Sequence, residues 1–223
     1  MKMKTALLLL WMVFSATIIC AEIFYSEGFV PAKPTYKRGN TTSLGDAAVA
    51  WKVYTDKGAD VTAYRTDPSH TAYDVDSPDG DRYRIFMGSG TLDDLAMISD
   101  APVISEKQRK DGIKISFRHR DTDGNRSSGY RVLLKVGGMW YASDLILTYH
   151  SPSIKTDWTE SSVNISSPIW IEFSDELTNG FSTDIFAVGA PLPDGDIEKV
   201  GLLLVNGDNG DNFRIDNFQI VGE

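Results

Sequence analysis

The feature that most constrains this chain is a series of short runs rich in β-branched and aromatic residues, each bounded by clusters of Gly, Pro, Asn and Asp. After residue 21, no segment holds a long apolar 3.6-residue period with helix caps. The clearest runs are EIFYSEGF, AVAWKVYT, YRIFMGSG, GIKISFRHR, YRVLLKV, MWYASDLILTY, PIWIEFS, DIFAVG, KVGLLLV and NFRIDNFQIV. About ten strands in one chain of this length predict an all-β domain, an antiparallel β-sandwich or barrel.

The N-terminus has the pattern of a secretory signal peptide. Lys2 and Lys4 precede an apolar run that ends near Ile19, and small residues follow at Cys20 and Ala21. The run is shorter than the roughly 20 residues that a membrane-spanning helix requires. We therefore expect residues 1–21 to be removed, which leaves a secreted domain over residues 22–223. A lipoprotein anchored at Cys20 is the alternative, but Ile19 is larger than the residue that such a site requires.

Composition narrows the chemistry of the mature domain. The single cysteine of the chain, Cys20, lies in the expected signal peptide, so disulfide bonds, thiol nucleophiles and cysteine metal ligands are excluded for the mature domain. Without Lys2 and Lys4, 20 basic residues face 31 acidic ones, a net charge of −11. This balance argues against nucleic acid or an anionic membrane as the partner. About 200 residues suffice for a core that needs no disulfides.

The stretch KVGGMWYASD predicts a tight hairpin. Two glycines tolerate the positive φ angles of a two-residue turn, which would pair Val136 with Met139. This register sends Tyr141 into the core and places Trp140 on the opposite face, facing Lys135 across the hairpin. In the same register Asp144 lies opposite Arg131. A shift of the turn by one residue would reverse this assignment.

A tryptophan on a polar sheet face suits a sugar ring, because the apolar side of a pyranose stacks on an indole and its hydroxyls meet charged groups. We expect Trp140 to be the main ligand-binding residue, with Arg131, Lys135 and Asp144 as hydrogen-bonding neighbours. Trp158, in the long loop after Tyr149, is the second expected aromatic contact. The alternative is that a long loop folds over this face and buries Trp140. Trp51 and Trp170 lie in apolar alternating strands and are expected in the core.

Four segments, EIFYSEGF, VGGMWYASD, LPDGDIEKVGLLL and FRIDNFQI, resemble secreted bacterial jelly-roll domains of the concanavalin-like and carbohydrate-binding-module type. The resemblance covers most of the mature chain as a pattern of spacing. It implies that the first and last strands lie side by side and close the sandwich, and that the partner is a polysaccharide or a cell-surface glycan.

The resemblance also implies a structural calcium ion between the terminal strands. Carried over to this sequence, its ligands are Glu27 and Asp216, with Asp211 as a third. Carboxylate oxygens suit this hard cation. Acidic residues near strand ends are, however, often simply solvated.

No catalytic motif is evident, so we expect a protein that is not an enzyme. The paired carboxylates of a retaining glycosidase are missing, since Glu172, Asp175 and Glu176 have the wrong spacing. A polysaccharide lyase on the same fold is the enzymatic alternative, because SFRHRD supplies His119 between Arg118 and Arg120. On a strand, however, His119 faces away from the two arginines. A third alternative is a structural cell-surface or matrix protein without a small ligand.

Overall fold

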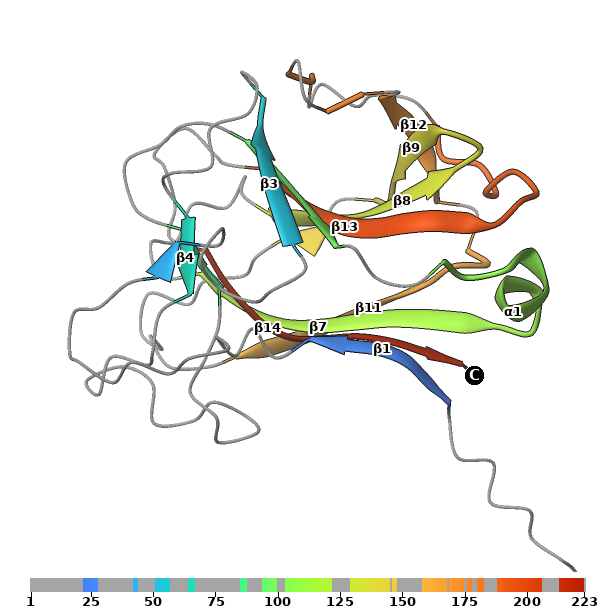
Figure 1. Ribbon diagram of the computed structural model, residues 1–223, viewed down its shortest axis with the longest axis horizontal. Coiled ribbons are helices and arrows are strands. Elements are labelled where there is room, and N and C mark those ends of the chain that lie inside the picture. Colours follow the sequence, from blue (N-terminus) through green and yellow to red (C-terminus); the bar gives the residue numbers. More distant parts are fainter. Residues whose placement is uncertain are drawn as a thin grey trace, which may run out of the picture.

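The chain folds as two antiparallel β-sheets packed face to face, with one short helix, in a computed structural model. Figure 1 shows the two sheets as separate layers. This is the predicted jelly-roll β-sandwich. The structure describes residues 22–27, 42–43, 51–56, 64–66, 85–87, 94–99, 103–121, 129–144, 146–147, 158–167, 169–174, 176–177, 180–182, 188–205 and 213–222.

The first sheet, sheet A, follows the order β11-β7-β14-β5-β4-β2, with β1 also paired to β14. The first and last strands therefore lie side by side, as the resemblance implied (Figure 1). The strands are β1 (Ile23–Glu27), β2 (Thr42–Ser43), β4 (Tyr64–Thr66), β5 (Ile85–Met87), β7 (Ile113–Asp121), β11 (Thr159–Asn164) and β14 (Phe213–Gly222).

The second sheet, sheet B, follows the order β12-β9-β8-β13-β6-β3, with β10 also paired to β8. Its strands are β3 (Trp51–Thr55), β6 (Leu95–Ser99), β8 (Gly129–Val136), β9 (Met139–Ala142), β10 (Ile146–Leu147), β12 (Ile171–Ser174) and β13 (Ile197–Val205). The predicted strand MWYASDLILTY is thus divided into β9 and β10, and the predicted run DIFAVG lies mostly outside the described residues.

The apolar residues between the sheets form what we call the main core. Trp51 and Trp170 belong to it, as expected, and are 4% and 2% exposed. Their indole N–H groups donate to Tyr25 Oη at 3.1 Å and to the Ile165 carbonyl at 2.9 Å. The polar N–H groups of these two buried rings are therefore hydrogen-bonded, and the rings themselves pack in the core.

Sheet B is also apolar on the side that faces away from sheet A. A second group of buried residues, which we call the outer cluster, lies there and consists of Ala96, Ile98, Leu133, Trp140, Ala142, Leu177 and Leu203. Strand β13 contributes to both groups. Val200, Leu202 and Leu204 belong to the main core, and Leu203 belongs to the outer cluster. The run GLLLV is apolar on both faces because both faces of its sheet are covered.

The helix α1 (Glu106–Lys110) lies at one end of the sandwich (Figure 1). Ser105 begins it with a capping box, in which its hydroxyl accepts from the Gln108 amide and the Gln108 side chain reaches back to the Ser105 amide. Arg109 is buried and donates to the Pro193 carbonyl at 2.7 Å, which fastens the helix to the loop before β13. No helix among the described residues has the length and apolar character needed to cross a bilayer.

Candidate functional site

The hairpin that carries Trp140 has the predicted register. Gly137 and Gly138 have φ angles of 59° and 84°, and Val136 pairs with Met139 across them. Lys135 pairs with Trp140, so these two side chains share the face that points away from sheet A. Tyr141 faces the other way and packs against the main core.

The exposure predicted for Trp140 is wrong. The side chain is only 4% exposed and belongs to the outer cluster, which also contains Leu177 from beyond β12. The alternative stated from the sequence, a covered tryptophan, is the arrangement in the structure. Lys135 still lies against the ring, with Nζ 5.8 Å from its centre, a cation–π distance.

Polar groups lie at one margin of the outer cluster. The Arg131 guanidinium is half-buried, and its Nη1 donates to the Ser143 carbonyl at 2.8 Å. Ser143 is itself held firmly, since its hydroxyl accepts from the Val132 amide and donates to the Asp144 carbonyl, both at 2.9 Å. Arg131 Nε is buried and has no hydrogen-bond partner among the described residues.

The electrostatics of this margin follow from its partial burial. Burial lowers the pKa of Arg131, because it penalises the charged guanidinium, and the nearby Asp144 carboxylate opposes that shift. Asp144 is exposed. The margin therefore presents a half-buried cationic donor near an exposed acceptor.

The structure does not bring Trp158 and Trp140 together. Trp158 is half-buried and directly precedes β11, the edge strand of sheet A. Trp140 lies in β9 of sheet B and points away from sheet A. The two rings therefore cannot form the two ends of one groove.

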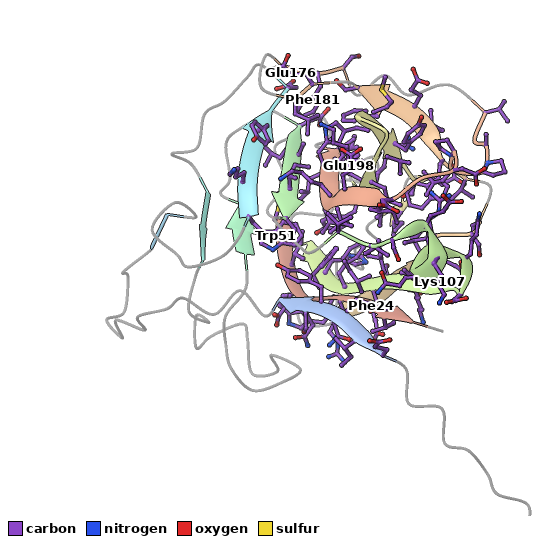
Figure 2. The ribbon with its side chains drawn as sticks, turned by 45° about the vertical axis from the view of Figure 1, so that its right-hand side comes forward. Phe24, Trp51, Lys107, Glu176, Phe181 and Glu198 are labelled. Carbon is purple, nitrogen blue, oxygen red and sulfur yellow. The ribbon has the colours of Figure 1, made fainter. Side chains whose placement is uncertain are left out.

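Two residues that the sequence analysis did not identify, Leu177 and Phe181, close the outer cluster; we call them the cover residues. Leu177 is 4% exposed within the cluster, and Phe181 packs against it. Figure 2 shows Phe181 and Glu176 beyond sheet B, on the side away from Phe24 of sheet A. An apolar pair within the polar stretch DELTNGFS was the available signal, since exposed loops seldom retain such residues unless they cover a surface.

The cover residues also reveal that sheet B curves. The Phe181 amide donates at 3.1 Å to the carbonyl of Asp56, directly after β3, while its ring centre lies 5.4 Å from that of Phe173 in β12. β3 and β12 are the two ends of the strand order, which a flat sheet would place roughly 24 Å apart. Two phenylalanine side chains cannot bridge that distance, so the face that carries Trp140 is concave.

The predicted calcium ligands are described only in part. Asp216 is fully buried, and its Oδ1 accepts from the Asn217 amide at 2.8 Å. The backbone of Glu27 pairs with Phe218, two residues from Asp216, but the Glu27 side chain and the whole of Asp211 lie outside the described residues. Among the side chains that are described, no three His, Cys, Asp or Glu residues are grouped as metal ligands.

The residues considered for a lyase do not converge. His119 is 3% exposed and lies in the sandwich interior, where it bonds Ser161 Oγ at 2.8 Å and packs against Tyr130 with ring centres 4.8 Å apart. Burial lowers the pKa of His119 to about 4. Arg118 is on the other face of the strand, where its Nη2 lies 3.8 Å from Glu160 Oε2. A polymer cannot reach this imidazole.

No protein-family model matches the sequence, and no curated protein sequence matches it. Solved structures of similar shape include a family 61 carbohydrate-binding module in complex with β-1,4-galactotriose, at 12% identity and a TM-score of 0.44, covering 78% of this chain and 88% of that one. The family 11 carbohydrate-binding module of a Clostridium thermocellum cellulase aligns at 14% identity and a TM-score of 0.47, covering 84% of this chain and 97% of that one.

An arabinose-bound α-L-arabinofuranosidase also aligns, at 10% identity and a TM-score of 0.45, over 82% of this chain but only 25% of the enzyme. Carbohydrate-binding modules, the class that the sequence resembles, are therefore among the structural neighbours.

Proposed function

We propose that this chain is a secreted, non-catalytic carbohydrate-binding β-sandwich whose ligand contacts the concave face of sheet B. The observation that carries the proposal is the margin of the outer cluster, where the half-buried Arg131 guanidinium and the exposed Asp144 carboxylate lie near each other. Sugars present neighbouring hydroxyls that both donate and accept, so one sugar can satisfy a donor and an acceptor placed side by side. Lys135 and the Trp140 ring extend the same face.

Binding can be tested by calorimetric titration with a panel of soluble neutral and acidic polysaccharides. Asp144→Asn should weaken binding about tenfold, the effect of losing one hydrogen bond to a charged group. Glu160→Gln is the matched control, because it makes the same chemical change on the exposed edge of sheet A. Equal affinities of wild type and Asp144→Asn would reject this site, and no binding across the panel would reject the proposed function.

We extend the proposal to secretion with cleavage after Ala21. Residues 1–21 lie outside the described residues, but Glu22, the first residue after the cleavage site, already belongs to the fold, since its carbonyl accepts from the Gly222 amide at 2.8 Å. Cleavage there would leave β1 intact. The intact mass of the exported protein should correspond to a chain that begins at Glu22, and a lipid-modified Cys20 would contradict this.

Calcium bound by Glu27, Asp216 and Asp211 belongs to the proposal as well. Its support is that the fully buried Asp216 carboxylate lies beside the first strand, where a cation would supply a positive charge. Arg118 lies opposite Asp216 in the strand register and is the competing source of that charge. Chelation should lower the melting temperature of the wild type and leave Asp216→Asn unchanged; a wild type insensitive to chelator would exclude the ion.

Two alternatives have clear tests. A lyase would release unsaturated uronates, which absorb in the ultraviolet, from at least one acidic polysaccharide of the panel. A matrix protein without a small ligand would bind no glycan while the fold remained intact. Nothing among the described residues favours either alternative over glycan binding.

A further inference from the structure

Three basic side chains share the concave face of sheet B. Lys135 of β8 lies directly opposite Lys199 of β13 on one side and opposite Trp140 of β9 on the other. Arg131 lies four residues before Lys135 on β8, and side chains at even spacings along a strand are on the same face. All three basic residues are half-buried. The face therefore gathers positive charge in a chain whose acidic residues outnumber its basic ones, 31 to 22.

The pair formed by Lys135 and Lys199 is the unusual part of this face. Directly opposed residues on neighbouring strands hold their Cβ atoms roughly 5 Å apart, and like charges in such a pair are destabilising. Lys199 also interacts with further groups of the chain. An ammonium group has three donors, however, so a lysine with one protein contact can still offer charge and a hydrogen bond to a ligand. An anionic group bound at this pair would offset the repulsion between the two ammonium groups.

The ammonium group of Lys135 is positioned by the ring beside it. Its Nζ lies 5.8 Å from the centre of the Trp140 ring, which is itself 4% exposed. A cation–π contact orients an ammonium group without neutralising its charge. Among the described residues, no carboxylate forms an ion pair with Lys135. The buried ring therefore holds a positive charge in place at the surface of the concave face.

The other end of the face has a different character. There the Asp144 carboxylate lies near Arg131 and offsets its positive charge, and Arg131 Nη1 donates to the Ser143 carbonyl at 2.8 Å. This end suits hydroxyl groups, which both donate and accept. Four residues of a strand separate the backbones of Arg131 and Lys135 by roughly 13 Å. A ligand longer than one sugar ring would contact both ends.

The negative net charge of the whole chain does not oppose an anion at this place. At physiological ionic strength the Debye length is about 8 Å, so exposed charges further away are largely screened. A bound anionic group therefore responds mainly to the charges next to it, and here these are the ammonium groups of Lys135 and Lys199.

We infer that the glycan bound by the concave face is acidic, and that Lys135, with Lys199 beside it, binds an anionic group on one of its sugars. The anionic group is a carboxylate or a sulfate, and hydroxyls of another sugar meet Arg131 and Asp144. Trp140 then acts by orienting Lys135, since its ring is too deeply buried for a sugar to stack on it. This inference names the ligand class of the proposed function and rests on it.

Matched pairs of polysaccharides test the ligand class by calorimetric titration. Each polyuronate is compared with its carboxyl-reduced form, and each sulfated polysaccharide with its desulfated form, so that the two members of a pair differ only in charge. In at least one pair the acidic member should bind about tenfold more tightly, the effect of one hydrogen bond to a charged group. The pair that shows the preference distinguishes a carboxylate ligand from a sulfate.

Substitutions of Lys135 test the assignment of the anion to this residue. Lys135→Gln should weaken binding of the acidic member about tenfold and leave the neutral member nearly unchanged. Lys135→Arg should retain the preference, because a guanidinium also stacks on an indole and keeps the charge. Lys114→Gln is the matched control: Ile113 and Ile115 on either side of it lie in the main core, so Lys114 is on the outer face of sheet A. It should bind both members as the wild type does.

The outcomes separate this inference from the proposed function. Equal affinity for the acidic and neutral members of every pair would overturn the inference and leave glycan binding standing. Equal losses in Lys135→Gln and Lys114→Gln would also overturn it, because the ligand would then respond to the general charge of the protein. If no member of any pair binds, the proposed function fails and the ligand class fails with it. Thermal unfolding of each variant checks that it is folded.

Discussion

Sheet B buries both of its faces, but the two sides are closed by different means. Towards sheet A, its side chains meet a second hydrogen-bonded layer, and Trp170 is enclosed with its N–H bonded to the Ile165 carbonyl. On the other side, Trp140 is almost equally inaccessible, but it belongs to the outer cluster, which includes Leu177 and against which Phe181 packs. Low exposure of a side chain therefore does not reveal how firmly it is enclosed.

The two tryptophans provide the largest test of this comparison. Trp170→Ala should lower the free energy of unfolding by about 4 kcal/mol, because the cavity lies between two rigid sheets and the bonded N–H is lost. Trp140→Ala should cost only about 2 kcal/mol, because the cover can settle into part of the space. Urea denaturation monitored by circular dichroism measures both. Equal losses would indicate that the two faces are enclosed equally firmly.

His119 tests how well the main core excludes charge. Its folded-state pKa, about 4, lies below the ordinary value of 6.5, so the unfolded chain binds the proton more tightly. The stability that depends on neutral His119 is complete above pH 6.5 and is lost as the pH falls towards 4. Between pH 6.5 and pH 5 we expect a loss of about 2 kcal/mol.

His119→Gln is the control for this pH dependence. Glutamine can retain a hydrogen bond to Ser161 but does not titrate. The variant should show a smaller decline in unfolding free energy over the same pH range, measured by urea denaturation in matched buffers. Parallel curves for the two proteins would mean that His119 is hydrated or charged in the folded state, which would contradict a dry core at that position.

Gly201 tests the floor of the concave face. A Cβ placed there would lie 2.3 Å from the Met97 carbonyl oxygen of β6 and 2.7 Å from Ile98 Cδ1. The first contact is with backbone, so β6 and β13 would have to move apart. We expect Gly201→Ala to cost about 2 kcal/mol in thermal unfolding. A neutral effect would show that these strands separate easily and that the floor of the concave face is not rigid.

Much of the fold could be predicted because strand signals are local. Two adjacent glycines determined the turn, and the turn determined that Trp140 and Tyr141 point in opposite directions. The apolar run in β13 likewise indicated a sheet covered on both sides. In contrast, β11 was not among the predicted strands; TESSVN is polar, but it forms an edge strand with one buried residue, Val163.

The candidate site was harder to predict because burial depends on distant residues. Alternation assigns Trp140 to a face but does not reveal what covers that face, and the cover comes from beyond β12. The curvature that allows Phe181 to meet both Asp56 and Phe173 also arises only when the whole sheet is assembled. The hairpin register alone determines that Lys135 and Trp140 lie on the same side of the sheet, and the structure has this pair.

The smallest expected effect lies at the tip of the hairpin, where neither covered face is involved. Glu198 of β13 accepts the Gly138 amide through Oε1 at 2.9 Å, at an exposed position. Glu198→Ala should cost only about 0.5 kcal/mol, because water can replace the carboxylate. Thermal unfolding measures the loss, and Glu160→Ala on the edge of sheet A is the matched control. A loss as large as that of Trp140→Ala would show that the hairpin tip, rather than the cover, is what stabilises the outer face of sheet B.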